Sequence, residues 1–271
     1  MSKIVFIGGG NMASCLIGGM LAKGFPKREI LVSEPSEASR QRIASTYGVE
    51  VTEDNLSAVS SAQIILLAVK PQVMSEVAKN LASELSHQPT IVSIAAGIPV
   101  SALQNWLGGQ LKIVRAMPNT PAMVQTGATG LFANQPLNNE EQATVENIFN
   151  AVGYACWVEN ESLIDAVTAV SGSGPAYFFL VYEAMQQVAQ ELGLDASTAE
   201  QLTLHTALGA AQLALSSDKP ASELRRQVTS PGGTTQAAVE CFQDQGIEAM
   251  FRKAMNSAAD RAVQMARDLT K

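Results

Sequence analysis

The chain has 271 residues, of which 46% are hydrophobic and 16% charged, and its formal net charge is −7. This length holds one large domain or two ordinary ones with a real core, and the composition differs from that of disordered chains. The acidic balance argues against partners made of nucleic acid and against docking on an anionic membrane. We expect no signal peptide, and no apolar stretch of the roughly 18–20 residues that a membrane helix needs.

Cysteine and histidine are too sparse and too scattered for a metal site. The three cysteines show no metal-binding or redox spacing, and the two histidines are His87 and His205. We therefore expect no metal ion and a reduced, cytoplasmic protein.

The first half alternates predicted strands with predicted helices. Short apolar runs predict strands at residues 3–7, 29–34, 62–71, 89–97 and 111–119. Helical patterns follow Asn11 and occupy residues 35–48 and 100–107. Such alternation predicts an α/β fold with a parallel sheet covered on both faces. Residues 128–133 and 154–159 extend this sheet around a helix at 139–151.

The second half contains helical patterns only, at residues 176–193, 197–216, 234–245 and 247–269. We predict two domains, an α/β domain at residues 1–160 and an all-helical domain at residues 161–271. The helices are rich in alanine and methionine, as expected if they are buried against a second copy of the chain. A tightly packed monomeric bundle is the alternative.

The first predicted strand runs into the glycine motif G-x-G-x-x-A, formed by Gly8, Gly10 and Ala13. The first glycine permits a tight turn, the second lets the backbone approach a pyrophosphate, and the small third residue lets helix and strand pack closely. The helix that Asn11 is expected to cap offers free N–H groups to phosphates. This order of elements predicts a Rossmann-like dinucleotide-binding domain, in which Gly9 has no role.

A residue at the end of the second predicted strand should bind the adenosine ribose. Glu34 stands there and can accept the 2′-hydroxyl of NAD(H). Ser33, Ser36, Arg40 and Arg42 are close enough to meet the 2′-phosphate of NADP(H), unless the arginines are ordinary solvated charges. The cofactor preference stays open.

Two more motifs follow strands at what should be the ligand-binding edge of the sheet. AVKP (68–71) and AAGI (95–98) end consecutive predicted strands. Lys70 is a donor to a phosphate or ribose, or else a surface lysine. MPNTP (117–121) is a rigid loop that holds polar groups against a ligand, or only a turn.

The helical half contains two candidate anion sites. SGSGPAY (171–177) places Pro175 at the first turn of a helix, and TSPGGTT (229–235) combines two glycines with hydroxyls before another helix. Each is a candidate carboxylate nest, and each alone is also explained as a helix cap.

A general base is missing where an alcohol dehydrogenase would need one. Between Trp157 and Lys219 there is no lysine or arginine, and the one histidine, His205, is expected to be buried or at an interface. Oxidation of an alcohol needs a group that exchanges the hydroxyl proton. Reduction of a C=N bond needs mainly positioning, because the nitrogen arrives protonated.

These motifs together resemble the pyrroline-5-carboxylate reductases. IGGGNMA, AVKP, SIAAGI, RAMPNTP, SGSGPAY and VTSPGGTTQAA cover essentially the whole chain in the order of that family. The resemblance implies transfer of hydride from NADP(H) or NAD(H) to 1-pyrroline-5-carboxylate, which gives L-proline. It also implies a homodimer through the helical domain, with a decamer of five dimers as the larger assembly.

The resemblance also implies a set of site residues. The cofactor set is Gly8, Gly10, Asn11, Met12, Ala13, Ser33, Glu34, Asn55, Ala68, Val69, Lys70, Pro71, Ala95, Ala96 and Gly97. The substrate set is Ser230, Gly232, Gly233, Thr234 and Thr235, with Thr235 as the catalytic hydrogen-bond partner of the ring nitrogen. Many members carry a small polar residue at the position of Glu34, so strong NADPH preference is not implied.

Two alternative functions are weighed against this one. A β-hydroxyacid dehydrogenase would place a lysine on the long helix of the second domain, where GPAYFFLVYEAM offers Tyr177 and Glu183 instead. A non-catalytic, dinucleotide-binding oligomer would have no need of the loop at 230–235.

Overall fold

The computed structural model describes residues 4–270 and consists of two compact units. The first unit ends at Ser173 and includes the chain again from Ser257, and the second unit is Gly174–Asn256. The first is the parallel-rich α/β unit and the second is helical, which confirms the predicted fold class. The division of function at residue 160 remains a prediction.

The α/β unit is built on one eight-stranded sheet of order β3-β2-β1-β4-β5-β6-β7-β8. All neighbouring strands are parallel except β6 and β7. Ile4 pairs with both Ile30 and Ile64, so the carboxyl ends of the central strands lie at one level. The strands are β1 (Ile4–Ile7), β2 (Ile30–Ser33), β3 (Glu50–Thr52), β4 (Ile64–Leu67), β5 (Thr90–Ser93), β6 (Ile113–Met117), β7 (Gly127–Ala133) and β8 (Gly153–Trp157).

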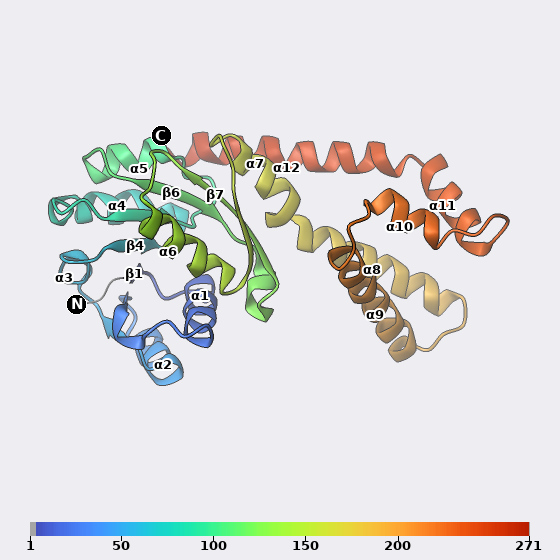
Figure 1. The fold of residues 1–271 in the computed structure, drawn as a ribbon, viewed down its shortest axis with the longest axis horizontal. Helices are drawn as coiled ribbons and strands as arrows, with labels where there is room; N and C mark the ends of the chain where they lie inside the picture. Colours follow the sequence, from blue (N-terminus) through green and yellow to red (C-terminus); the bar gives the residue numbers. More distant parts are fainter. Residues whose placement is uncertain (1–3, 271) are drawn as a thin grey trace. The chain divides into compact units, whose positions relative to one another are not determined.

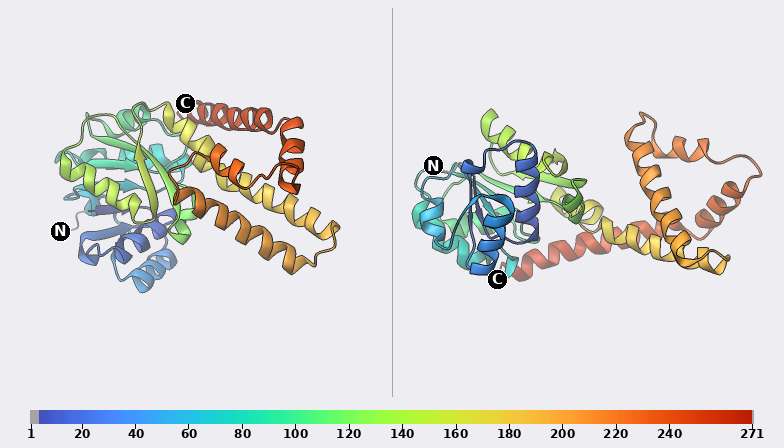
Figure 2. Two further views of the ribbon diagram at one scale, coloured as in Figure 1. Left: turned by 45° about the vertical axis from the view of Figure 1, so that its right-hand side comes forward. Right: turned by 90° about the horizontal axis from the view of Figure 1, so that it is seen from below.

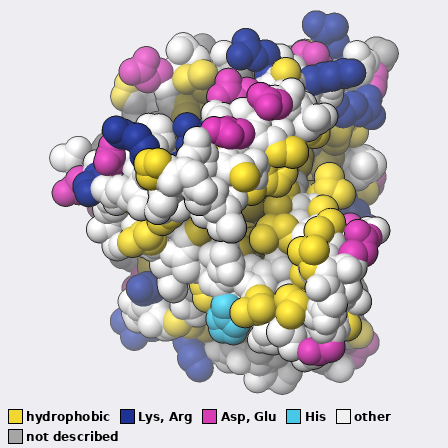
Figure 3. All heavy atoms as spheres, turned by 90° about the vertical axis from the view of Figure 1, so that its right-hand side faces the viewer, with side chains coloured by type: hydrophobic (Ala, Val, Ile, Leu, Met, Phe, Trp, Pro, Cys, Tyr) yellow, Lys and Arg dark blue, Asp and Glu magenta, His cyan; other side chains and the backbone are white. Residues whose placement is uncertain are grey.

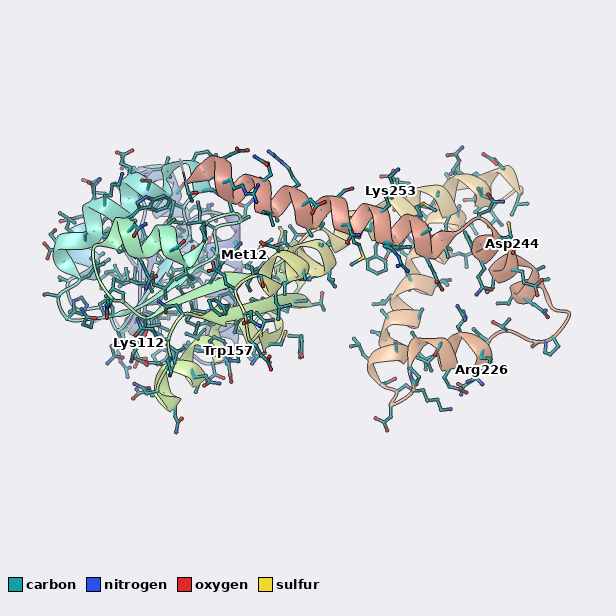
Figure 4. The ribbon with its side chains drawn as sticks, turned by 90° about the horizontal axis from the view of Figure 1, so that it is seen from above. Met12, Lys112, Trp157, Arg226, Asp244 and Lys253 are labelled. Atoms are coloured by element: carbon teal, nitrogen blue, oxygen red, sulfur yellow. The ribbon has the colours of Figure 1, made fainter. Side chains whose placement is uncertain are left out.

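Helices cover both faces of the sheet (Figure 1). Alternate residues of a strand face opposite layers, so Ile4 and Phe6 belong to one buried cluster and Val5 and Ile7 to the other. The first layer contains α1 (Asn11–Ala22), α2 (Glu37–Tyr47) and α6 (Asn139–Asn150). The second contains α3 (Asn55–Val59), α4 (Pro71–Leu81) and α5 (Val100–Leu107). Lys112 and Trp157, labelled in Figure 4, each hydrogen-bond a glutamate of α6.

Some boundaries differ from the sequence-based expectation. Residues 62–71 are predicted as one strand, whereas β4 ends at Leu67 and Pro71 begins α4. Proline suits the first turn of a helix because the N–H that it lacks has no partner there. The expected set also omits β3, α3, α4 and the short α10 (Ala221–Gln227), and the 3-10 turns Lys27–Glu29, Ala82–Glu84 and Thr120–Val124.

The helical unit contains α8 (Gly174–Glu191), α9 (Ala196–Leu215), α10 and α11 (Thr234–Asp244). The last helix, α12 (Ile247–Leu269), begins in this unit and ends in the α/β unit. Helices α8 and α9 form a hairpin, contact each other and diverge away from their connection (Figure 2). A large part of the apolar side chains of this unit has no cover within the protomer.

Exposed apolar side chains gather on these helices (Figure 3). Large exposed residues include Phe178, Phe179, Leu180, Leu208 and Met250, and Leu180 is 66% exposed. A monomeric bundle would bury them, so the packed-monomer alternative does not describe this unit. Such a contiguous apolar surface is typical of an interface between copies of a chain.

The described residues include one helix that is long and apolar enough to cross a membrane. It joins α7 (Leu163–Val167), a π-helical turn (Thr168–Gly172) and α8 into 29 residues, Leu163–Glu191, with a mean hydropathy of 1.2 in its most apolar window. From the sequence we expect no such stretch, and by length and composition this helix is one. Length and composition alone are weak evidence of a membrane span, because core helices of soluble proteins and signal sequences also have them.

Candidate functional site

Gly8 lies where the ends of three strands converge. Its φ is +99° and its N–H donates to the Ser33 carbonyl over 2.8 Å. A Cβ atom at this position would lie 2.8 Å from the Ala68 carbonyl oxygen. A side chain is therefore excluded by both the backbone conformation and the close approach of the chain after β4. The tight turn predicted for Gly8 is present.

Gly10 leaves open space in front of helix α1. A Cβ atom there would meet nothing within 4 Å, and Gly10 itself is the N-cap of α1. No side chain caps the helix, and its first turn holds no acidic residue. Asn11 is the first helical residue, so its expected role as the cap is wrong. The uncapped N–H groups and the positive end of the helix dipole make this a suitable position for an anion.

Gly9 has a structural role that the sequence does not reveal. Its N–H donates to Glu34 Oε2 over 2.8 Å, and a Cβ atom would lie 2.3 Å from Ile43 Cδ1. The expectation that Gly9 has no role is therefore wrong. The three glycines thus have different surroundings: the backbone after β4 confines Gly8, the Ile43 side chain contacts Gly9, and Gly10 faces open space.

The carboxylate of Glu34 is held beside the glycine turn. Oε2 accepts the N–H of Gly9 over 2.8 Å, and Oε1 accepts the N–H of Ser36 over 3.1 Å. The half-buried side chain stands at the end of β2, as expected for a residue that reads the adenosine ribose.

The two nearby arginines are engaged in the fold. Arg40 donates to the carbonyl of Glu34 over 2.8 Å and pairs with Glu53 over 2.7 Å. Arg42 donates to the carbonyl of Gly9 over 3.1 Å and to the hydroxyl of Ser14. These bonds support the turn itself, so the description of both arginines as simple solvated charges does not hold.

The predicted cofactor residues gather at the carboxyl edge of the parallel strands. Ser33 is buried at the end of β2 and donates to Asn55 Oδ1 over 2.6 Å, which connects β2 with the start of α3. The glycine turn follows β1, residues 68–71 follow β4, and residues 95–97 follow β5. Strand β1 lies between β2 and β4, so the direction of chain progression reverses there, and ligands bind at such a point.

The loop after β5 is held by polar contacts at both ends. The N–H of Ala95 donates to Ser93 Oγ over 3.3 Å, and the N–H of Val100 donates to Glu161 Oε1 over 2.8 Å. Gly97, between them, has a φ of +74°. Lys70 is exposed as the N-cap residue of α4. The structure therefore brings all the predicted cofactor residues to one edge of the α/β unit.

A buried arginine supports this edge and is not among the predicted residues. Arg115 on β6 is 5% exposed and pairs with Glu161 over 3.1 Å and with Asp165 over 3.3 Å. Glu161 thereby connects β6 to the amino end of α5. An arginine within an otherwise apolar predicted strand is the signal that would have found this network, because a buried charge needs a partner.

The predicted substrate residues form a single loop of the helical unit. Helix α11 begins at Thr234 with Gly233 as the N-cap and without a side-chain cap. The loop is closed by a bond from the N–H of Gly233 to the Ser230 carbonyl over 3.0 Å, and the N–H of Gly232 donates to Gln236 Oε1 over 2.7 Å. The side chains of Ser230, Thr234 and Thr235 are exposed. This arrangement suits a carboxylate at the helix end and leaves the hydroxyls available.

The second expected anion nest stays a prediction. SGSGPAY contains the start of α8 at Gly174, with Pro175 in the first turn as expected, but α8 directly follows the π-helical turn at Thr168–Gly172. The N–H of Ser173 donates to the Thr168 carbonyl over 2.8 Å and so is not free for a ligand. The small residues also serve packing, since a Cβ atom at Gly172 would lie 2.7 Å from Met117 Cε.

The remaining candidate groups add no reactive centre. His205 is exposed on α9 of the protomer, so the buried alternative is wrong and the interface alternative stays open. All three cysteines are free, and burial raises the pKa of the Cys15 thiol, which keeps it protonated. Within residues 4–270 no group of three or more His, Cys, Asp or Glu could hold a metal ion.

The fold and this edge together define a class of protein. A glycine turn leads into a helix without a side-chain cap, and an acidic residue follows the second strand. In the helical unit, a glycine-containing loop precedes a second helix without a side-chain cap. These are the features of an oxidoreductase that uses a nicotinamide dinucleotide.

Comparison with known proteins identifies the family. Residues 161–265 match the model described as pyrroline-5-carboxylate reductase dimerisation, and residues 3–97 match NADP oxidoreductase coenzyme F420-dependent. A pyrroline-5-carboxylate reductase of Pseudomonas aeruginosa is 49% identical over 267 residues, with 98% of each chain covered. The chain belongs to the pyrroline-5-carboxylate reductase family.

Solved structures show the same fold over the same length. The reductase of Coxiella burnetii is 41% identical with a TM-score of 0.95, and 98% of each chain is covered. The pyrroline carboxylate reductase of Plasmodium falciparum, solved with NADP bound, is 28% identical with a TM-score of 0.84, again over 98% of each chain.

Proposed function

We propose that this chain reduces the C=N bond of 1-pyrroline-5-carboxylate with NAD(P)H and releases L-proline, the last step of proline biosynthesis. The observation that carries the proposal is the uncapped amino end of α1 behind Gly10, beside the fixed carboxylate of Glu34. This arrangement accepts a dinucleotide, and the family membership indicates the acceptor.

The reaction requires little acid–base catalysis by protein side chains. Bound NAD(P)H supplies one hydride to the imine carbon, and the imine nitrogen carries the proton that makes the product a secondary amine. No lysine or arginine lies between Trp157 and Lys219, which agrees with a reaction that needs no general base. The chain binds the carboxylate, orients the ring and excludes water.

We assign the substrate carboxylate to the loop formed by Ser230, Gly232, Gly233 and Thr234. The helix end supplies N–H groups, and its dipole favours the negative charge. Thr235, one residue further along α11, holds the ring nitrogen through its hydroxyl. The cofactor phosphates are assigned to residues 8–13, the adenosine to Ser33, Glu34 and Asn55, and the nicotinamide half to residues 68–71 and 95–97.

We infer that NADH is used better than NADPH. The carboxylate of Glu34 is fixed by two N–H groups and would repel a 2′-phosphate. Arg40 and Arg42 already bond to Glu53, Ser14 and backbone carbonyls, so neither stands ready to neutralise that phosphate.

The dimerisation region implies a homodimer, and we propose a decamer of five dimers as the larger assembly, in the cytoplasm. The exposed apolar helices supply the surface for the dimer. Light scattering after size exclusion separates two from ten copies of the 28.6 kDa chain.

Turnover is tested by following nicotinamide absorbance with 1-pyrroline-5-carboxylate, in parallel with NADH and NADPH. Oxidation of either cofactor with formation of proline supports the function, and the ratio of the two rates reports the preference. A folded protein that binds cofactor but oxidises it with no cyclic imine would contradict the proposal and favour the non-catalytic oligomer. Oxidation of β-hydroxyacids would favour the dehydrogenase instead.

A further inference from the structure

The end of helix α12 packs against the loop after β5. Residues of α12 from Ser257 onward belong to the same compact unit as the sheet. A methyl group added to Gly97 would lie 3.3 Å from Leu269 Cδ1, 3.3 Å from Met265 Cβ and 3.6 Å from the nitrogen of Ala266. Helix and loop are therefore in van der Waals contact at a glycine that admits no side chain. The C-terminus is drawn beside α5, which follows this loop (Figure 1).

The last turns of α12 present one regular face to the α/β unit. Ala262 is buried, and Met265, Ala266 and Leu269 are half-buried, at the i, i+3, i+4, i+7 spacing of one helix face. We call these four residues the C-terminal stripe. The residues between them, Val263, Gln264, Arg267 and Asp268, are exposed. Leu269 also packs on the buried cluster that contains Ala95, Ile98 and Val100.

The loop that the stripe contacts is anchored by the buried side chain of Ile98, and Gly97 just before it meets the stripe. Its first residues are fixed by Ser93 Oγ and its end by Glu161 Oε1. Between these two contacts Gly97 adopts a φ of +74°, and glycine is the residue with the widest choice of alternative conformations. An apolar surface pressed against Gly97 therefore selects one loop conformation.

We propose that Leu269, supported by Met265, is a positioning residue for the nicotinamide half of the cofactor. This inference rests on the proposed function, in which residues 95–97 line that half. The stripe keeps the loop in the conformation that receives the nicotinamide, so cofactor affinity depends on the last turns of α12. Because α12 begins in the helical unit, the helix that serves the dimerisation region also supports the cofactor loop.

The test compares two ligands on the full-length dimeric protein. NADH contacts both halves of the site, whereas ADP-ribose lacks the nicotinamide. In Leu269→Ala we expect the dissociation constant of NADH to rise about fivefold, with that of ADP-ribose unchanged within about twofold. Leu269→Met, which keeps the volume, should restore NADH binding.

Two control variants separate positioning from general loss of stability. Leu85→Ala removes a fully buried leucine of the same cluster at the opposite, amino-terminal edge of β5, and should lower Tm without changing NADH affinity. Val263→Ala alters the exposed face of α12 and should change neither quantity.

The proposal is overturned if Leu269→Ala binds NADH as the wild type does, or if NADH and ADP-ribose weaken together. If Leu269→Ala does not fold, Leu269→Val gives the same comparison with a smaller loss of volume. Failure of the proposed function is a separate result, because a wild type that binds NADH without reducing an imine leaves these binding constants measurable.

Discussion

Asn119 supplies Ser171 with the hydrogen bond that its own helix cannot provide. In a regular helix the Ser171 carbonyl would accept from residue 175, but Pro175 has no N–H. Asn119 Nδ2 donates to that carbonyl over 3.0 Å instead, and Asn119 Oδ1 accepts the N–H of Ala128 over 2.8 Å. One buried amide thus joins the loop after β6, the start of β7 and the π-helical turn, and lets Leu163–Glu191 continue through a proline.

Asn119→Ala should therefore be strongly destabilising. It leaves a part-buried carbonyl and a part-buried N–H without partners, and the two together should cost about 1–3 kcal/mol. Urea unfolding at constant protein concentration measures the loss. Asn139→Ala, at an exposed position on α6, is the matched control and should change the free energy of unfolding by no more than about 0.5 kcal/mol. Equal free energies of unfolding for the two variants would show that the Asn119 hydrogen bonds do not contribute to stability.

The neighbouring glycines Gly9 and Gly10 should fail in different ways. Gly9→Ala places a methyl group 2.3 Å from the present position of Ile43 Cδ1, so the end of that side chain must move and we expect a loss of up to about 1 kcal/mol of stability. Gly10→Ala meets nothing within 4 Å at a φ of −67°, so it should fold normally. The added methyl group would occupy the phosphate approach and raise the KM for the cofactor by about tenfold or more. Thermal melts and cofactor titrations of both variants separate the two effects. A Gly10→Ala variant with unchanged KM would show that the cofactor phosphates do not bind at Gly10.

Glu34→Ser should shift the cofactor preference towards NADPH. Removing the carboxylate eliminates its repulsion of a 2′-phosphate and its bond to the ribose, so the NADPH-to-NADH ratio of kcat/KM should rise about tenfold. Glu37→Ser, an exposed change three residues away, should leave the ratio as it is. An unchanged ratio in Glu34→Ser would mean that the carboxylate supports only the turn.

Thr235→Ala should lower kcat by about tenfold or more, because a hydrogen bond that positions the reacting nitrogen is lost. Thr235→Ser keeps the hydroxyl and should recover most of the rate. Ser197→Ala removes an exposed hydroxyl of α9 and serves as the control. Thr235 would have no part in the mechanism if Thr235→Ala turned over at the wild-type rate.

Glu141 should contribute a small acid-sensitive part of the stability. Burial acts to raise the pKa of its carboxyl, but hydrogen bonds from Lys112 and from the Asn138 N–H outweigh it and leave the pKa lowered. A lowered folded-state pKa stabilises the fold above the ordinary value, about 4.3, and this contribution is lost as the pH falls through the lowered value. Lys112→Met should reduce the loss of unfolding free energy in this acidic range by less than about 1 kcal/mol, since the pair is partly exposed. Lys79→Met, at an exposed position of α4, should keep the wild-type pH dependence of stability.

Much of the α/β unit is readable from local signals. Strands β1, β2 and β4 are apolar runs, and the residues that directly follow them are Gly8, Glu34 and Ala68. The ends of these strands therefore place the glycine turn and Glu34 at one edge of the sheet. Local signals fail where a short element relies on its neighbours. Strand β3 has three residues with a polar first position, and it exists because β2 offers an unpaired edge.

Contacts between distant segments were beyond the reach of sequence patterns. Gly9 touches Ile43 on another helix, Arg115 finds its partners in the segment that follows β8 in the sequence, and Asn119 replaces a bond that Pro175 removes. The helix start at Pro175 is present, but the π-helical turn before it is not predicted from the sequence, since a side chain from another motif satisfies the carbonyl that the proline leaves free. In each case a local rule was overridden by a tertiary partner.

The uncovered apolar faces of α8 and α9 also affect the steady-state abundance of this protein in a cell. A newly made protomer that has not met a second copy presents Phe178, Leu180 and Leu208 to the solvent. Such surfaces are what chaperones and proteases recognise, and pairing rises with concentration by mass action. Dilute protomers would be degraded in preference to paired ones, so abundance should respond more than proportionally to the rate of synthesis.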